Sequence, residues 1–159
     1  MQMGYVLPSL AEGFLSFGYP EHLLIWSWRR IALGRSCCPV MMDEFAAACG
    51  EDGPEVFVTF CTFLKALAVS SRRQFIIGTP GCATVTADER QVLTLLAAAQ
   101  AQSPALLEAH LRWIAILEKR HVLEIATRAL ARALAFNELS LVLPTDELPT
   151  VCERPRAVA

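Results

Sequence analysis

The chain lacks any uninterrupted apolar run of the length that a membrane-spanning helix needs, about 18 residues or more. Lys65 interrupts the most apolar stretch, and the Arg29-Arg30 pair ends an earlier one. Residues 1–13 also lack the basic start of a secretory signal peptide. We therefore expect no membrane span and a cytoplasmic location.

The chain also lacks an excess of charge of either sign. It has 14 Lys and Arg residues against 16 Asp and Glu residues, for a net charge of −2. The basic residues come in scattered pairs: Arg29-Arg30, Arg72-Arg73 and Lys119-Arg120. Because nucleic-acid binding needs a longer basic stripe or patch, we expect no nucleic-acid partner.

Sequence motifs for catalysis and metal binding are missing as well. The chain has no HExxH, CxxC, GxxxxGK[ST] or GxSxG motif. His110 and His121 would lie about 16 Å apart along one helix, which is too far for two ligands of one metal ion. The acidic pair Asp88-Glu89 falls in the first turn of a predicted helix, where it complements the helix dipole without any catalytic role. We predict no enzyme activity, no catalytic residues, no metal site and no cofactor.

Apolar residues, in contrast, are abundant. They make up 54% of the 159 residues, and the mean hydropathy is +0.40. A chain of this length can form one domain with a sizeable core. Apolar residues beyond the needs of that core are most simply placed in an interface with a second copy or a partner.

The most apolar segment covers about residues 54–70 and has helical periodicity. Its predicted buried face consists of Phe57, Phe60, Cys61, Leu64, Leu67 and Ala68. Valines and Phe63 cover most of the remaining surface, so other elements should surround this helix. We expect it to be the central helix, with Phe60 and Leu64 in the core.

Further helices are predicted from their end signals. The first two cover about residues 20–33 and 39–49. A third begins with a capping box at Thr86 and Glu89. The last helical segment follows Ser103 and covers residues 104–136. The last segment is one helix or two, and a break near residues 118–121 is favoured. Its predicted core face includes Leu117, Val122, Ala126, Ala129, Leu130, Ala133 and Phe136. Residues 74–78 form either a short strand or, as we favour, a buried connection.

The predicted fold is therefore all-α, a compact bundle of five or six helices around a central apolar helix at about residues 54–70. An irregular N-terminal arm occupies residues 1–18, and the helical domain covers residues 19–137. Residues 138–159 contain three prolines and little periodicity, which predicts an extended or disordered tail.

The stretch Val85-Thr86-Ala87-Asp88-Glu89-Arg90, continued to residue 97, resembles the opening helix of LuxR-type DNA-binding domains. In that family, a short turn, a second helix and a basic recognition helix follow. This chain continues instead with Ser103-Pro104 and a helix rich in Ala and Leu. The resemblance covers one helix and stops there, so the expectation of no nucleic-acid partner stands.

Six cysteines occur in the chain. Cys49 and Cys61 lie in apolar helical sequence and are expected to be buried. Cys37, Cys38 and Cys82 precede predicted helices, and a helix N-terminus stabilises a thiolate. These three are the candidate reactive thiols, and they support an alternative function as a thiol- or metal-responsive regulator.

Two tryptophans accompany arginines on predicted helices. Trp26 shares a helix face with Arg29 and Arg30, and Trp113 follows Arg112. Trp and Arg are enriched at the centres of protein interfaces. We take Trp26, Arg29, Arg30 and Trp113 as candidate interface residues. The favoured function is a non-enzymatic helical protein-interaction or oligomerisation module, acting as a homodimer or as a subunit of a larger assembly.

Overall fold

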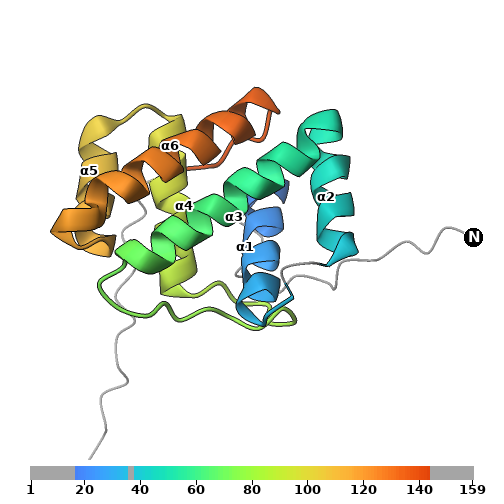
Figure 1. Cartoon of the computed structure of the whole chain (residues 1–159), viewed down its shortest axis with the longest axis horizontal. Helices are drawn as coiled ribbons and strands as arrows, with labels where there is room; N and C mark the ends of the chain where they lie inside the picture. The colour runs from blue at the N-terminus through green and yellow to red at the C-terminus, as the bar shows by residue number, and fades with distance from the viewer. Residues whose placement is uncertain (1–16, 36–37, 144–159) are drawn as a thin grey trace, which may run out of the picture.

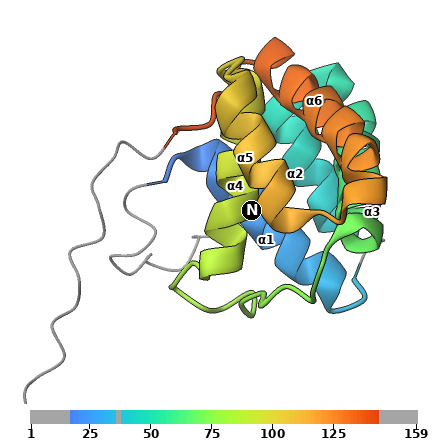
Figure 2. The ribbon, with the colours of Figure 1, turned by 90° about the vertical axis from the view of Figure 1, so that its left-hand side faces the viewer.

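A computed structural model of the chain describes residues 17–35 and 38–143. These residues form α-helices joined by short loops and two 3-10 turns, as Figures 1 and 2 show. The elements are α1 (Tyr19–Ala32), α2 (Pro39–Cys49), η1 (Gly50–Asp52), α3 (Gly53–Ser70), α4 (Ala87–Gln100), α5 (Pro104–Ile114), η2 (Leu117–Lys119) and α6 (Arg120–Phe136). Within this part of the chain there is no strand, and the predicted all-α bundle is confirmed.

Helix α3 is the central element, as expected. It runs between α2 on one side and α6 on the other, with which it makes its main packing contacts (Figure 1). Phe57, Phe60, Leu64 and Leu67 are buried, as predicted, whereas Cys61 is only half-buried. Ala68, predicted to be buried, is exposed instead, while Phe63 is fully buried. The interior therefore extends around α3 towards Phe63.

A sharp turn at η1 joins α2 to α3. Gly50 ends α2 with a φ of 60°, a left-handed conformation that suits glycine. A Cβ atom on Gly53 would lie 2.6 Å from the backbone of Ala46, so the two helices meet too closely there for any side chain. The chain consequently folds back, and α3 packs against α2.

By length and composition alone, the helical segment Pro39–Ser70 could cross a membrane, and half of its most apolar window is buried inside the protein. The core helix of a folded domain meets the same criterion. The segment bends at η1 and its two halves pack together, so the buried half of its apolar window belongs to the core. The absence of a membrane span stays a prediction.

The helical break in the second half of the chain comes slightly earlier than predicted. Helix α5 ends at Ile114. Ala115 and Ile116 have extended backbone conformations, and η2 follows them. Leu117, predicted to be in the core, is exposed in this turn. A break at Ala115 resets the helical phase, so the periodicity of α5 does not carry over into α6.

Because of that change of phase, the predicted core face of α6 is only partly correct: Leu130 is buried, and Ala126 and Ala133 pack partly against the core. The side chains that face the interior are Leu123, Thr127, Leu130, Ala131 and Leu134. Val122, Ala129 and Phe136 are exposed instead, with Phe136 at 82%. Leu130 is the one large residue that was placed correctly. Helix α6 thus keeps an apolar outer face in addition to its buried one.

The folded part of the chain extends beyond the predicted boundary at residue 137. Leu139 and Leu141 are buried in the core. The Gln100 side chain donates to the carbonyl of Leu139 and accepts from the N–H of Leu141. The Val142 N–H donates to the buried Glu21 carboxylate. Residues 139–143 therefore follow a turn at Glu138 and are fixed to α4 and α1, and the rest of the predicted tail lies outside the described residues.

Of the predicted N-terminal arm, the described residues include Phe17 and Gly18, and Phe17 packs partly against the core. Residues 1–16 lie outside the described part. The connection between α3 and α4 contains no strand over residues 74–78. It is an extended loop with half-buried Phe75 and Ile77, close to the favoured prediction of a buried connection.

Candidate functional site

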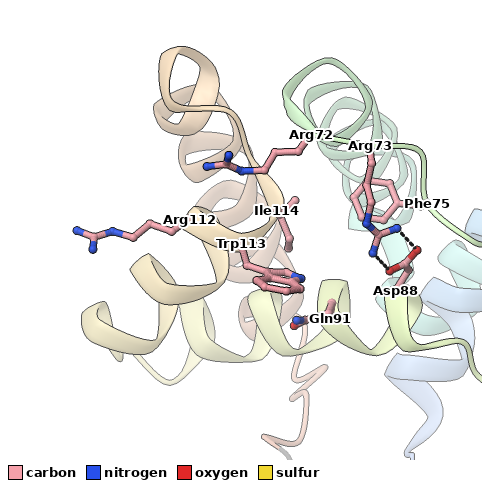
Figure 3. A pocket seen from close by; sticks show the side chains of 8 residues that line it. All are labelled: Arg72, Arg73, Phe75, Asp88, Gln91, Arg112, Trp113 and Ile114. Carbon is pink, nitrogen blue, oxygen red and sulfur yellow. Dashed lines mark hydrogen bonds and ion pairs between the residues drawn. The ribbon is translucent and has the colours of Figure 1, made fainter.

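A pocket of about 480 Å³ opens where the α3–α4 loop meets the end of α5 (Figure 3). Three arginines line it: Arg72, Arg73 and Arg112. Its apolar wall consists of Phe75, Trp113 and Ile114, and α4 contributes Asp88 and Gln91. We call this site the Arg–Trp pocket.

Trp113 is the most unusual residue of the pocket because its side chain is large and apolar, yet 66% exposed. It lies in the last turn of α5, where the preceding Leu111 and the following Ile114 turn into the core. In Figure 3 the indole lies at the centre of the pocket, over Gln91. An exposed indole beside guanidinium groups is typical of interface centres.

Backbone pairing between two distant segments holds the pocket together. Ser71 forms an isolated antiparallel bridge with Ala115. On either side of it, the Arg72 N–H donates to the Ile114 carbonyl at 3.0 Å and the Ile116 N–H donates to the Ser70 carbonyl at 2.9 Å. This pairing places the arginines that follow α3 next to the end of α5.

Arg73 is fixed by Asp88 on the α4 side of the pocket. Its guanidinium donates to both carboxylate oxygens, at 2.5 and 2.8 Å (Figure 3). The hydrogen bonds from Arg73 hold the pKa of the Asp88 carboxyl below its usual value, although partial burial opposes them. Asp88 also accepts from the Ile76 N–H at 2.7 Å, which ties the loop to the first turn of α4.

Arg72 and Arg112 are directed away from Asp88, and their guanidinium groups lie on the other side of Trp113 (Figure 3). Arg112 donates to Glu108 one helical turn earlier, at 2.8 Å, in a pair exposed to solvent. Among residues 17–35 and 38–143, the Arg72 guanidinium has no hydrogen-bond or ion-pair partner. The pocket thus offers cationic donors that the fold itself does not fully use.

Gln91 forms the floor of the pocket. Its side-chain oxygen lies 2.9 Å from Nδ1 of His110, a contact that links α4 to α5 and orients the amide. Burial lowers the pKa of His110, which favours the neutral imidazole. The Gln91 amide thus places a polar group in the pocket lining under Trp113.

The predicted interface residues do not form one surface. Trp26 and Arg30 lie together on α1, with the guanidinium carbon 4.9 Å from the indole centroid, and neither lines the Arg–Trp pocket. Trp113 lies on α5. Arg29 is 2% exposed and is removed from the candidate interface, because it belongs to the interior.

The Arg29 guanidinium is instead the centre of a buried network. It pairs with Glu89 through Nε at 2.7 Å and through one terminal nitrogen at 2.8 Å. It also donates to three carbonyls of the α3–α4 loop: Thr79 at 3.1 Å, Cys82 at 2.7 Å and Thr84 at 2.7 Å. These bonds clamp the loop between α1 and α4, and so they set the position of the segment that carries Arg73 and Phe75.

The candidate thiols lie in different settings. Cys37 is outside the described residues. Cys38 is half-buried, and a hydrogen bond from Arg30 lowers the pKa of its thiol. Cys82 is also half-buried, and its hydrogen bond with Thr84 lowers the pKa of its thiol. The described residues contain no group of three or more side chains able to hold a metal ion.

Most pocket residues were not among the predicted site residues. Arg72-Arg73 and Arg112-Trp113 were visible as adjacent pairs, but no periodicity joins positions so far apart in the chain. The isolated Ser71–Ala115 bridge brings them together, and a single bridge leaves no recognisable sequence pattern.

Comparisons of the chain with protein-family models, with curated proteins and with solved structures give no match.

Proposed function

We propose that the chain is a non-enzymatic protein-interaction module whose Arg–Trp pocket docks a segment of a partner protein. The observation that carries the proposal is Trp113, which is 66% exposed in the wall of the pocket. Leaving an indole in water forgoes the free energy of its burial, about 25 cal/mol for each Å² of apolar surface. A partner that covers it recovers that free energy.

The size and rigidity of the pocket support the same function. A volume of about 480 Å³ accommodates one or two side chains of a docked segment. Its walls come from α4, α5 and the loop after α3, and hydrogen bonds join all three. A preformed site of this kind loses little conformational entropy on binding.

Selection of binders from a random peptide library displayed on phage tests this function. We expect peptides enriched on the wild-type chain to lose binding to Trp113→Ala, and to keep it for Trp26→Ala, a matched substitution on α1. Both variants should first be shown to unfold as single cooperative transitions. Failure to enrich any peptide, or equal binding to Trp113→Ala, would argue against the pocket as a docking site.

A second candidate function, oligomerisation, is supported by the outer face of α6. Val122, Ile125, Ala129 and Phe136 are all exposed there. Their spacing of three, four and seven residues follows a heptad seam. A second copy of the chain would cover this face. Helix α6 lies at the outside of the bundle (Figure 2).

The alternative of a thiol-responsive regulator keeps Cys38 and Cys82 as candidates, because both thiols are half-buried and have lowered pKa values. The expected cytoplasmic location and the absence of enzyme activity stay predictions.

A further inference from the structure

We infer that the Arg–Trp pocket recognises an acidic peptide segment, in which one apolar side chain is flanked by aspartate or glutamate. This inference rests on the proposed docking function and adds the chemistry of the occupant. The apolar residue would enter against Trp113, and the flanking carboxylates would pair with Arg72 and Arg112.

The charges of the pocket favour an acidic ligand. Three arginines line it, and one carboxylate in the lining, that of Asp88, is committed to Arg73. Arg72 has no partner in the described part of the chain, and Arg112 has an exposed one. An exposed Arg–Glu pair contributes only about 0–1 kcal/mol, so Arg112 can exchange Glu108 for a carboxylate of a ligand at little cost. A guanidinium binds a carboxylate through two parallel hydrogen bonds.

The apolar wall of the pocket favours a ligand with one apolar side chain. Phe75 is held in place by an edge-to-face contact with Trp28 of the core, with ring centroids 5.7 Å apart. Ile114, the last residue of α5, is buried in the core of the protein. Trp113 extends this fixed wall into solvent. A single aliphatic or aromatic side chain can therefore bury against Trp113 while acidic neighbours reach the arginines beside the indole.

The structure favours an acidic peptide over a phosphate group or a nucleic acid. A helix N-terminus often binds phosphate through its free N–H groups, but the first turn of α4 already holds the carboxylates of Asp88 and Glu89. A nucleic acid carries a negative charge on every phosphate, so its binding needs a basic surface that extends well beyond a single pocket. The net charge of the chain is −2, and its basic residues come in scattered pairs, so such an extended surface is not expected.

Fluorescence anisotropy with labelled probes tests the inference on the full chain. The first probe is a short peptide with a central Phe flanked by Asp and Glu. The second has Lys in place of every acidic residue, and the third has Ala in place of Phe. A single-stranded oligothymidylate of matched charge is the fourth probe. Each is titrated into the wild-type chain, Arg72→Glu and the matched control Arg132→Glu, which changes an exposed arginine of α6 outside the pocket.

We expect the acidic Phe peptide to bind the wild-type chain and Arg132→Glu equally, and to bind Arg72→Glu at least about tenfold more weakly. Added salt should weaken its binding, because exposed charge pairs are screened. The Lys peptide should not bind, and the Ala peptide should bind more weakly than the Phe peptide.

Tighter binding of the Lys peptide, or binding of the oligothymidylate alone, would overturn the inference about acidic segments. Absence of binding by every probe would overturn it too. The docking function itself is judged separately, by whether displayed peptides of any charge depend on Trp113. The two ideas can therefore fail independently.

Discussion

At the scale of single residues, the Arg29 guanidinium is the most completely bonded side chain of the loop region. Its five N–H donors match the five hydrogen bonds that it makes to Glu89 and to the carbonyls of Thr79, Cys82 and Thr84. Glu89 accepts in addition from the backbone N–H groups of Gly78 and Thr86. A buried ion pair costs desolvation energy, which is tolerable only when the remaining donors and acceptors are satisfied in this way.

Gly78 is expected to be intolerant of substitution because of this network. A Cβ atom at Gly78 would lie 2.6 Å from the Arg29 guanidinium. We predict that Gly78→Ala lowers the free energy of unfolding by about 1–3 kcal/mol, as measured by urea denaturation. Gly81 in the same loop has open space at its Cβ position and is the control. Gly81→Ala should change stability by no more than about 0.5 kcal/mol, and equal effects of the two substitutions would contradict the clamp.

The buried pair and a surface pair can be compared directly. Glu89→Gln leaves Arg29 charged in the interior without its counter-ion, and should cost about 3–5 kcal/mol. Glu108→Gln weakens the exposed pair with Arg112 and a second pair with Arg120 at 3.5 Å, and should cost less than about 1 kcal/mol. Urea denaturation at neutral pH measures both, and similar costs would show that the Arg29–Glu89 pair is not buried as described.

The same carboxyl predicts an acid dependence of stability. Burial raises the pKa of Glu89, but hydrogen bonds from Arg29, Thr86 and Gly78 outweigh burial and hold the pKa below its usual value. A lowered pKa in the folded state contributes stability that is present above the unfolded pKa, about 4.3 for Glu, and lost as the pH falls through the folded pKa. The wild-type free energy of unfolding should therefore decline below about pH 5, with a shallower decline in Glu89→Gln. Parallel profiles would be inconsistent with this assignment.

At the scale of elements, the start of α4 was the best predicted helix end. Thr86 accepts from the Glu89 N–H at 3.1 Å, and the Glu89 carboxylate accepts from the Thr86 N–H at 2.8 Å, which completes the capping box. The Thr86 hydroxyl also donates to the carbonyl of Ile76 at 2.7 Å. Ser103 precedes α5 in the same position, but its side chain makes no capping hydrogen bond.

This difference predicts unequal effects of two similar substitutions. Thr86→Ala should lower the free energy of unfolding by about 1–2 kcal/mol, because it leaves the Glu89 N–H without its acceptor. Ser103→Ala should have an effect within about 0.5 kcal/mol, since no capping bond is lost. Thermal denaturation of both variants measures these changes. An equal loss of stability at the two sites would mean that the capping hydrogen bonds of Thr86 do not stabilise the protein.

Helix ends could be predicted because caps, prolines and glycines are local signals, and α2 and α4 begin where those signals indicated. The inward face of α6 could not be predicted by continuing the pattern of α5. The break at Ala115 changes the helical phase, and it follows from pairing with Ser71, a contact distant in the sequence. Alanines also occur on both faces of α6, so the two faces differ little in hydrophobicity and the buried one is hard to predict.

At the scale of the whole molecule, the candidate site depends on contacts that join distant segments. Arg29 and Glu89 lie 60 positions apart, and Arg72 meets Ile114 through backbone pairing. The sequence marked Trp113 as an interface candidate through its type and its neighbour Arg112. It also suggested Arg29, for the same reason and incorrectly, because residue type does not reveal a buried partner elsewhere in the chain.

The apolar outer face of α6 leads to a prediction about assembly. We expect the mass measured by sedimentation equilibrium to rise above 17.5 kDa with increasing concentration. Ile125→Glu should abolish this rise, because it places a charge in the centre of the exposed seam, whereas Val40→Glu on α2 should not. A mass of one chain at every concentration would eliminate self-association and leave the pocket as the proposed interaction site.

NMR titration can show whether Trp113 and the arginines around it form a docking site. A chain labelled with ¹⁵N would be titrated with the acidic Phe peptide, and the three indole N–H signals followed. We expect shifts of the Trp113 indole and of the Arg72 and Arg112 side chains, with Trp26 and Trp28 unchanged. Shifts centred on Trp26, or none at Trp113, would contradict this expectation.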